Sequence, residues 1–79
     1  MSEQIKRLLR TIIGISLDDI NEIIEFLDHD EWGVAYEILC TVIEQENTII
    51  TIYQYQEIED IGNKMNMDSN LWNEIKYKV

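Results

Sequence analysis

An apolar repeat at helical spacing occupies the stretch WGVAYEILCTVIEQ, Trp32–Gln45, near the middle of this 79-residue sequence. Spacings of three and four residues place most of its apolar side chains on one face of an α-helix. The side chains predicted to face inward are those of Trp32, Ala35, Ile38, Leu39, Val42 and Ile43. Those of Glu37, Thr41 and Glu44 are expected to face solvent. An apolar face of this width predicts a helix that packs against other helices.

Two helices are predicted before this stretch. The chain has no proline, and its three glycines are far apart, so little opposes helix formation. The first helix has inward residues Ile5, Leu8, Leu9, Ile12 and Ile13 and stops at Gly14. The second begins at the cap Ser16, with Ile20, Ile23, Ile24 and Leu27 inward. The segment 28–30 is expected to be a turn, with His29 or Asp30 beginning the central helix.

Two more helices are predicted after the central stretch. Thr51 and Gln54 have the spacing of a capping box, although the β-branched residues of 48–53 also allow a short extended piece. Gly62 lies on the inward face of the fourth helix, where it would let a neighbour approach closely. Asp68 or Ser69 is expected to cap a last helix, with Leu71, Trp72 and Ile75 inward and Lys76 and Lys78 at its negative end. The predicted fold is therefore all-α, a compact bundle of four helices plus a short C-terminal helix, in one domain spanning 1–79.

Charge is the strongest feature of the composition. The net charge is −10, from 16 acidic and 6 basic residues. The Lys and Arg residues lie in two groups, three before Thr11 and three after Asn63. Between Thr11 and Asn63 there are 13 of the acidic residues and no basic one. Such a negative field repels nucleic acids and anionic membranes and attracts basic proteins. We therefore expect a basic protein partner, with no direct nucleic-acid binding and no membrane association.

Several chemistries are not expected. One cysteine, Cys40, cannot form an internal disulfide, so a buried thiol and a reducing, cytoplasmic location are predicted. One histidine, His29, provides too little for nucleophilic catalysis, so the protein is not expected to be an enzyme. Asp28, Asp30 and Gly33 match part of a calcium-binding loop, but Trp32 and Leu39 stand where ligand oxygens are required. No metal or other cofactor is predicted.

The predicted contact residues are mainly acids on outward helix faces. Tyr53 lies among acidic and amide side chains, a composition typical of an interface anchor, and Phe26 also lies off the apolar face of its helix. Trp72 is instead expected in the core. The candidate partner-binding residues are Asp18, Glu22, Glu25, Asp28, Asp30, Glu37, Tyr53, Glu57 and Asp60.

Two alternatives share this acidity and size. An acyl carrier protein holds its prosthetic arm on a serine in an Asp-Ser-Leu turn near mid-chain, whereas Ser16-Leu17 follows Ile15 and comes early, and Asp68-Ser69-Asn70-Leu71 is interrupted and late. A DNA-mimic inhibitor would use its carboxylates to occupy a nucleic-acid enzyme. The two alternatives are thus a carrier or adaptor with a solubilising surface and a mimic of nucleic acid.

From Leu27 to Trp72 the sequence resembles the MafI family of bacterial immunity proteins. The matching segments are Leu27–Gly33, Ala35–Cys40, Tyr55 followed by Ile58–Gly62, and Trp72. The resemblance implies a cytoplasmic antitoxin that binds the C-terminal toxin domain, often a nuclease, of a secreted or contact-delivered polymorphic toxin. It implies no catalytic residues and no cofactor. Ile49–Ile52 is more apolar than this family leads us to expect.

Overall fold

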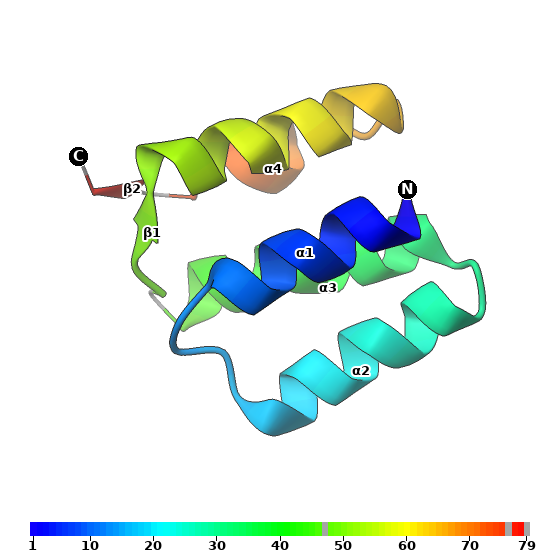
Figure 1. Ribbon diagram of the computed structural model, residues 1–79. Helices are drawn as coiled ribbons and strands as arrows, with labels where there is room; N and C mark the ends of the chain where they lie inside the picture. Colours follow the sequence, from blue (N-terminus) through cyan, green and yellow to red (C-terminus); the bar gives the residue numbers. More distant parts are fainter. Residues whose placement is uncertain (47, 76, 79) are drawn as a thin grey trace.

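The computed structural model describes residues 1–46 and 48–75, together with the backbone of Tyr77 and Lys78 (Figure 1). The helices are α1 (Ser2–Thr11), α2 (Leu17–Asp28), α3 (Trp32–Gln45), α4 (Ile52–Lys64) and the short α5 (Asn70–Asn73). Two short strands, β1 (Ile50–Thr51) and β2 (Tyr77–Lys78), complete the described elements. The all-α class and the number of helices predicted from the sequence are confirmed.

The helices pack around α1 and α3. α2 packs along α3, α1 contacts both α2 and α4, and α5 packs on α3. Figure 1 shows α2 and α4 on opposite sides of α1 and α3. The two strands pair in parallel, with Ile50 opposite Tyr77 and Thr51 opposite Lys78. This pairing holds the end of the chain against the segment that leads into α4.

Each long helix buries one apolar face in a shared core. Ile5 and Leu8 of α1, Ile23 and Leu27 of α2, and Ile58 of α4 are all at most 1% exposed. Their spacing follows the three- and four-residue repeat found in the sequence, because that repeat keeps apolar side chains on one side of a helix. Burial of these faces, together with the capping of helix ends, accounts for the arrangement.

The buried face of α3 is turned from the predicted one. Tyr36 and Cys40 are buried, as are Ala35 and Leu39, whereas Trp32 is 38% exposed and Ile38 is half-buried. The prediction for Trp32 is therefore wrong, and that for Cys40 is confirmed. The physical reason is that α4 and α5 also cover α3, because Tyr36 meets Ile58 of α4 and Trp72 of α5.

Of the three glycines, Gly62 lies closest to side chains of other elements. A Cβ atom added at Gly62 would lie 2.6 Å from the Tyr36 hydroxyl oxygen and 2.7 Å from Cη2 of Trp72. The Tyr36 hydroxyl donates a hydrogen bond to the Ile58 carbonyl oxygen. The Tyr36 and Trp72 rings meet edge to face, with centroids 6.2 Å apart. We call Tyr36, Gly62 and Trp72 the aromatic seam, and it joins α3, α4 and α5.

The predicted caps of α2 and α4 are present. The Ser16 hydroxyl accepts a hydrogen bond from the Asp19 amide. Thr51 and Gln54 form the expected capping box, and the extended piece foreseen as an alternative is also there, as β1. The Gln54 amide nitrogen also donates to the Thr11 carbonyl oxygen at 2.9 Å. Gln54 therefore both caps α4 and joins it to the end of α1.

Three local predictions are wrong. α1 ends at Thr11, Ile12 is extended, and Ile13 is 87% exposed because the chain is already turning towards α2 at Gly14, where φ is +103°. α3 begins at Trp32 with Glu31 as its cap residue, later than expected. α5 ends at Asn73, and Lys78 lies in β2 because that segment pairs with β1 instead of continuing the helix. Lys76 lies outside the described residues.

Candidate partner-binding surface

The structure separates the nine candidate residues into two groups. Asp18, Glu22, Glu25 and Asp28 lie on α2, Asp30 in the following turn and Glu37 on α3. Tyr53, Glu57 and Asp60 lie on α4. All are exposed except Glu57, which is half-buried. Because α2 and α4 flank opposite sides of α1 and α3, one flat contact cannot cover both groups along the length of the helices, although both helices begin at the same end of the molecule (Figure 1).

Two of the eight candidate carboxylates are paired within the chain. Lys6 Nζ lies 2.8 Å from Asp28 Oδ1, and this hydrogen bond is the main reason that the pKa of Lys6 is raised. Lys64 Nζ lies 3.0 Å from Asp60 Oδ2. Both pairs are at the surface, where such pairs contribute little to stability. Their charge is locally balanced, so Asp28 and Asp60 are weaker candidates than the other acids.

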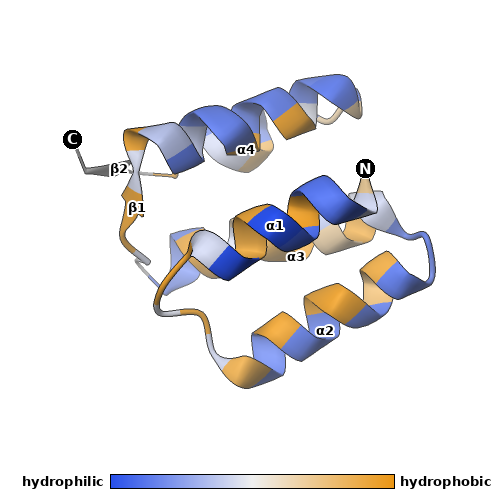
Figure 2. Ribbon diagram, viewed as in Figure 1, coloured by the Kyte–Doolittle hydropathy of each residue, from blue (hydrophilic) through white to orange (hydrophobic). Residues whose placement is uncertain are grey.

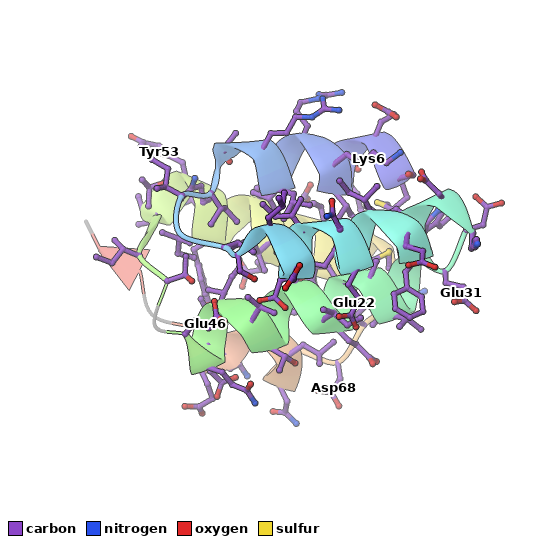
Figure 3. The ribbon with its side chains drawn as sticks, turned by 90° about the horizontal axis from the view of Figure 1, so that it is seen from below. Lys6, Glu22, Glu31, Glu46, Tyr53 and Asp68 are labelled. Carbon is purple, nitrogen blue, oxygen red and sulfur yellow. The ribbon has the colours of Figure 1, made fainter. Side chains whose placement is uncertain are left out.

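Five other exposed acids lie on α2 and α3, two helices that pack against each other. Asp18, Glu22 and Glu25 follow one another at spacings of four and three residues, which places them on one side of α2. In Figure 3 Glu22 lies between α2 and α3 as these helices are seen from below. Glu37 and Glu44 on α3 are also exposed, and neither helix contains a Lys or Arg. We call Asp18, Glu22, Glu25, Glu37 and Glu44 the acidic face.

The aromatic candidates differ in their exposure. Tyr53 is 78% exposed on α4, which confirms the prediction that it faces outward. Phe26 is half-buried and packs against the core, so its predicted exposure is wrong. The apolar repeat of α2 alone did not indicate this contact with the core.

Sequence reasoning missed two exposed apolar regions. One is an open groove of about 500 Å³, to which Met1, Trp32, Val34, Met65 and Met67 contribute. The other consists of Ile13, Leu17 and Ile49, which are 87%, 70% and 65% exposed. Alternation along the β1 segment could have indicated Ile49, because the next residue, Ile50, is buried and successive residues of an extended chain face opposite sides. Nothing in the helical repeat distinguished Ile13.

The Cys40 thiol is not placed for chemistry. It is 1% exposed, and burial raises its pKa to about 12, while the Tyr36 hydroxyl acts in the opposite direction. A thiol with such a pKa is protonated at neutral pH and is a poor nucleophile. His29 is exposed and forms the C-cap of α2, a structural role at a helix end.

The described residues include no cluster of three or more His, Cys, Asp or Glu side chains that could hold a metal ion. Within the same part of the chain, no helix is long and apolar enough to cross a bilayer. The class of molecule that fold and surface define is a small all-α domain with one strongly acidic face. Comparisons with protein-family models, with curated proteins and with solved structures each gave no significant match.

Proposed function

We propose that this protein is a cytoplasmic immunity protein that binds and neutralises the toxin domain, a nuclease, of a secreted or contact-delivered toxin. The observation that carries the proposal is the acidic face, a set of exposed carboxylates on two adjacent helices without a Lys or Arg on either. The resemblance of Leu27–Trp72 to the MafI immunity proteins gives independent support.

The physical argument concerns competition for the same positive groups. A nuclease must bind a polyanion, and so it presents Lys and Arg side chains around its catalytic cleft. An acidic protein surface complements such a cleft and excludes the nucleic acid from it. Complementary charge also accelerates encounter between the two proteins. Rapid capture suits an antitoxin, which has to act before the toxin cleaves nucleic acid.

The proposal is tested with the toxin domain encoded next to this chain. Co-expression of the two should protect cells that the toxin domain alone kills, and the purified pair should form a stoichiometric complex that no longer cleaves nucleic acid. Toxicity that persists with the folded protein present at the same level would contradict the proposal.

Charge reversal tests the role of α2 in that complex. Replacing Glu22→Lys and Glu25→Lys should slow association by at least about tenfold at low salt and reduce its dependence on ionic strength. The matched control is Glu3→Lys with Glu59→Lys, which changes net charge equally at exposed positions outside α2 and α3. An equal effect of both pairs of substitutions would mean that association depends on total charge. No effect of either pair would mean that α2 is not part of the contact surface.

The alternative functions make different predictions. As a carrier, the chain would gain the mass of a phosphopantetheine group when treated with coenzyme A and a phosphopantetheinyl transferase, and intact mass spectrometry detects this. Ser16, which precedes Leu17, already uses its hydroxyl to cap α2 and to donate to Asp19 at 2.9 Å. A DNA-mimic inhibitor would bind a housekeeping nucleic-acid enzyme in place of the toxin domain. Neither alternative has an observation in its favour beyond acidity.

A further inference from the structure

Four large apolar side chains at one end of the molecule are mostly exposed. They belong to Ile13 in the loop after α1, Leu17 at the start of α2, Ile49 before β1 and Tyr53 in the first turn of α4. Their exposed fractions are 87%, 70%, 65% and 78%. Single exposed apolar residues are common, but several at one place usually mark a binding surface. We call these four residues the apolar tip.

Described contacts bring together the segments that contain Ile13, Ile49 and Tyr53, and Leu17 follows three residues after Gly14. Gln54, one residue after Tyr53, donates to the Thr11 carbonyl oxygen at 2.9 Å, which holds the start of α4 beside the end of α1. Gly14 lies next to Thr48, because a Cβ added there would be 3.9 Å from Thr48 Cγ2. Figure 2 shows the loop after α1 and the β1 segment as hydrophobic chain at the same end.

Ile13 and Ile49 of the tip remain exposed although residues on either side of each are buried. Ile12 and Ile15 are 5% and 8% exposed on either side of Ile13, and Ile50 is 1% exposed beside Ile49. The same end contains Thr48, whose buried hydroxyl has no hydrogen-bond partner among the described residues. Buried hydroxyls are almost always bonded, and departures from such rules concentrate at functional sites. This end of the molecule therefore departs from the packing rules in two independent ways.

The charges around the tip select the kind of partner. Asp18 follows Leu17, Glu57 lies one helical turn after Tyr53, and Glu46 is the C-cap of α3 at this end. The basic residues placed here are Arg10 near the end of α1 and Lys78, which lies opposite Thr51 in the strand pair. Figure 3 shows Tyr53 and Glu46 at one end of the bundle and Lys6 and Glu31 at the other. A second copy of the chain would bring the same net charge of −10, so self-association through this end is opposed.

We propose that the apolar tip is the anchoring surface for a basic protein partner that presents apolar side chains between Lys and Arg residues. That this partner is a toxin domain rests on the function proposed above. An apolar centre surrounded by charge is the usual anatomy of a protein interface, in which buried aromatic and aliphatic anchors limit dissociation. The acidic face continues into this end, because α2 begins and α3 ends there. The acids attract the partner, and the tip holds it.

The test uses defined peptides and needs no toxin. The isotope-labelled protein is titrated by NMR with an amphipathic helical peptide of leucine and lysine, with a serine–lysine peptide of the same charge, and with a leucine–glutamate peptide. The leucine–lysine peptide should shift the methyl signals of Ile13, Leu17 and Ile49 and the ring signals of Tyr53. The serine–lysine peptide should shift the acidic face without the tip, and the leucine–glutamate peptide should bind neither.

Substitutions connect those shifts to binding. Ile49→Ser with Tyr53→Ser should weaken the affinity for the leucine–lysine peptide about tenfold, as expected for loss of interface anchors. The control is Val34→Ser, which also removes an exposed apolar side chain (41% exposed) but borders the groove beside Trp32. Circular dichroism on all variants establishes that the fold is intact.

Four outcomes overturn the inference. The first two are failure of the leucine–lysine peptide to bind and signal shifts around Trp32 in preference to the tip. The others are a Val34→Ser variant that weakens binding as much as the tip variant does, and a dimer in light scattering that the tip variant abolishes. The proposed function fails separately, by loss of protection against the toxin domain. If the peptide binds at the tip but the protein does not protect against the toxin domain, the apolar tip stands as a binding surface and the antitoxin function is rejected.

Discussion

The aromatic seam and the apolar tip contain similar side chains in opposite environments. Tyr36 and Trp72 in the seam are 0% and 2% exposed, and Gly62 between them leaves no room even for a methyl group. Tyr53 at the tip is 78% exposed on the same helix as Gly62. The contrast teaches that residue type alone does not assign a role in this chain. What assigns it is whether another element covers the side chain.

The largest expected effect at the seam is that of Gly62→Ala. The added methyl group would overlap the Trp72 ring and the Tyr36 hydroxyl, so α4 would have to move away from α3 and α5. We expect a loss of about 3 kcal/mol in the free energy of unfolding, the upper part of the range for overpacking. Urea unfolding followed by circular dichroism measures it.

Gly33→Ala is the matched control for that substitution. It is also a helical glycine, but the nearest atoms to an added Cβ are those of Met67 at 3.9 Å, an ordinary contact distance. Replacement of glycine by alanine within a helix should then stabilise by about 0.5–1 kcal/mol. Equal effects at the two glycines would show that the seam is not tightly packed.

A smaller effect is expected from Tyr36→Phe. The variant keeps the ring but removes the hydroxyl that donates to the Ile58 carbonyl oxygen. Loss of a buried hydrogen bond should reduce the free energy of unfolding by about 1–2 kcal/mol. Tyr53→Phe, the same change at the exposed tip, should leave it unchanged. If Tyr53→Phe were the more damaging change, the contrast between seam and tip would be reversed.

The sequence predicted the seam better than the tip. Gly62 on the apolar face of its helix and Trp72 in the core could both be inferred from spacing, because helical periodicity reports which residues share a face. The role of Tyr36 could not, since it depends on how α4 and α5 pack against α3. The same applies to Trp32, which has the spacing of a core residue but lies on the side of α3 left open.

The candidate surface was predicted in composition but not in arrangement. Acidic residues on outward helix faces follow from periodicity, and the exposure of Asp18, Glu22 and Glu25 agrees with it. Their separation from the α4 candidates depends on tertiary packing, and the pairing of Asp28 with Lys6 spans 22 positions. Ile13 and Ile49 lie in connections between helices, where no repeat specifies direction.

The dependence of stability on alkaline pH tests the burial of the Cys40 thiol and of the Tyr36 hydroxyl. Burial raises the pKa of Cys40 from an ordinary 9.0 to about 12, so the folded protein keeps this proton over a pH range in which the unfolded chain releases it. Stability should therefore be unaffected by this group below pH 9 and should fall by about 1.4 kcal/mol per pH unit between 9 and 12. Burial also raises the pKa of the Tyr36 hydroxyl, and this adds to the loss.

The variant Cys40→Ala separates the contribution of the Cys40 thiol to this pH dependence from that of the Tyr36 hydroxyl. The variant should have a shallower decline of unfolding free energy with pH above 9, whatever its stability at pH 7, because the thiol no longer titrates. Urea titrations at a series of pH values measure the slopes. Identical slopes for the variant and the wild type would mean that the thiol is accessible to water.

The smallest expected effect is at the tip and compares two adjacent residues. Ile49 and Ile50 differ in exposure, 65% against 1%, because alternate residues of the extended segment before α4 face opposite sides. Ile50→Ser should cost several kcal/mol by removing core packing, whereas Ile49→Ser should change the free energy of unfolding by less than about 0.5 kcal/mol. Urea unfolding of both variants shows whether the Ile49 side chain lies on a free surface or belongs to the core. A large loss at Ile49 would place it in the core and remove it from the apolar tip, whereas a negligible loss leaves this exposed isoleucine with no role in folding and available for a partner.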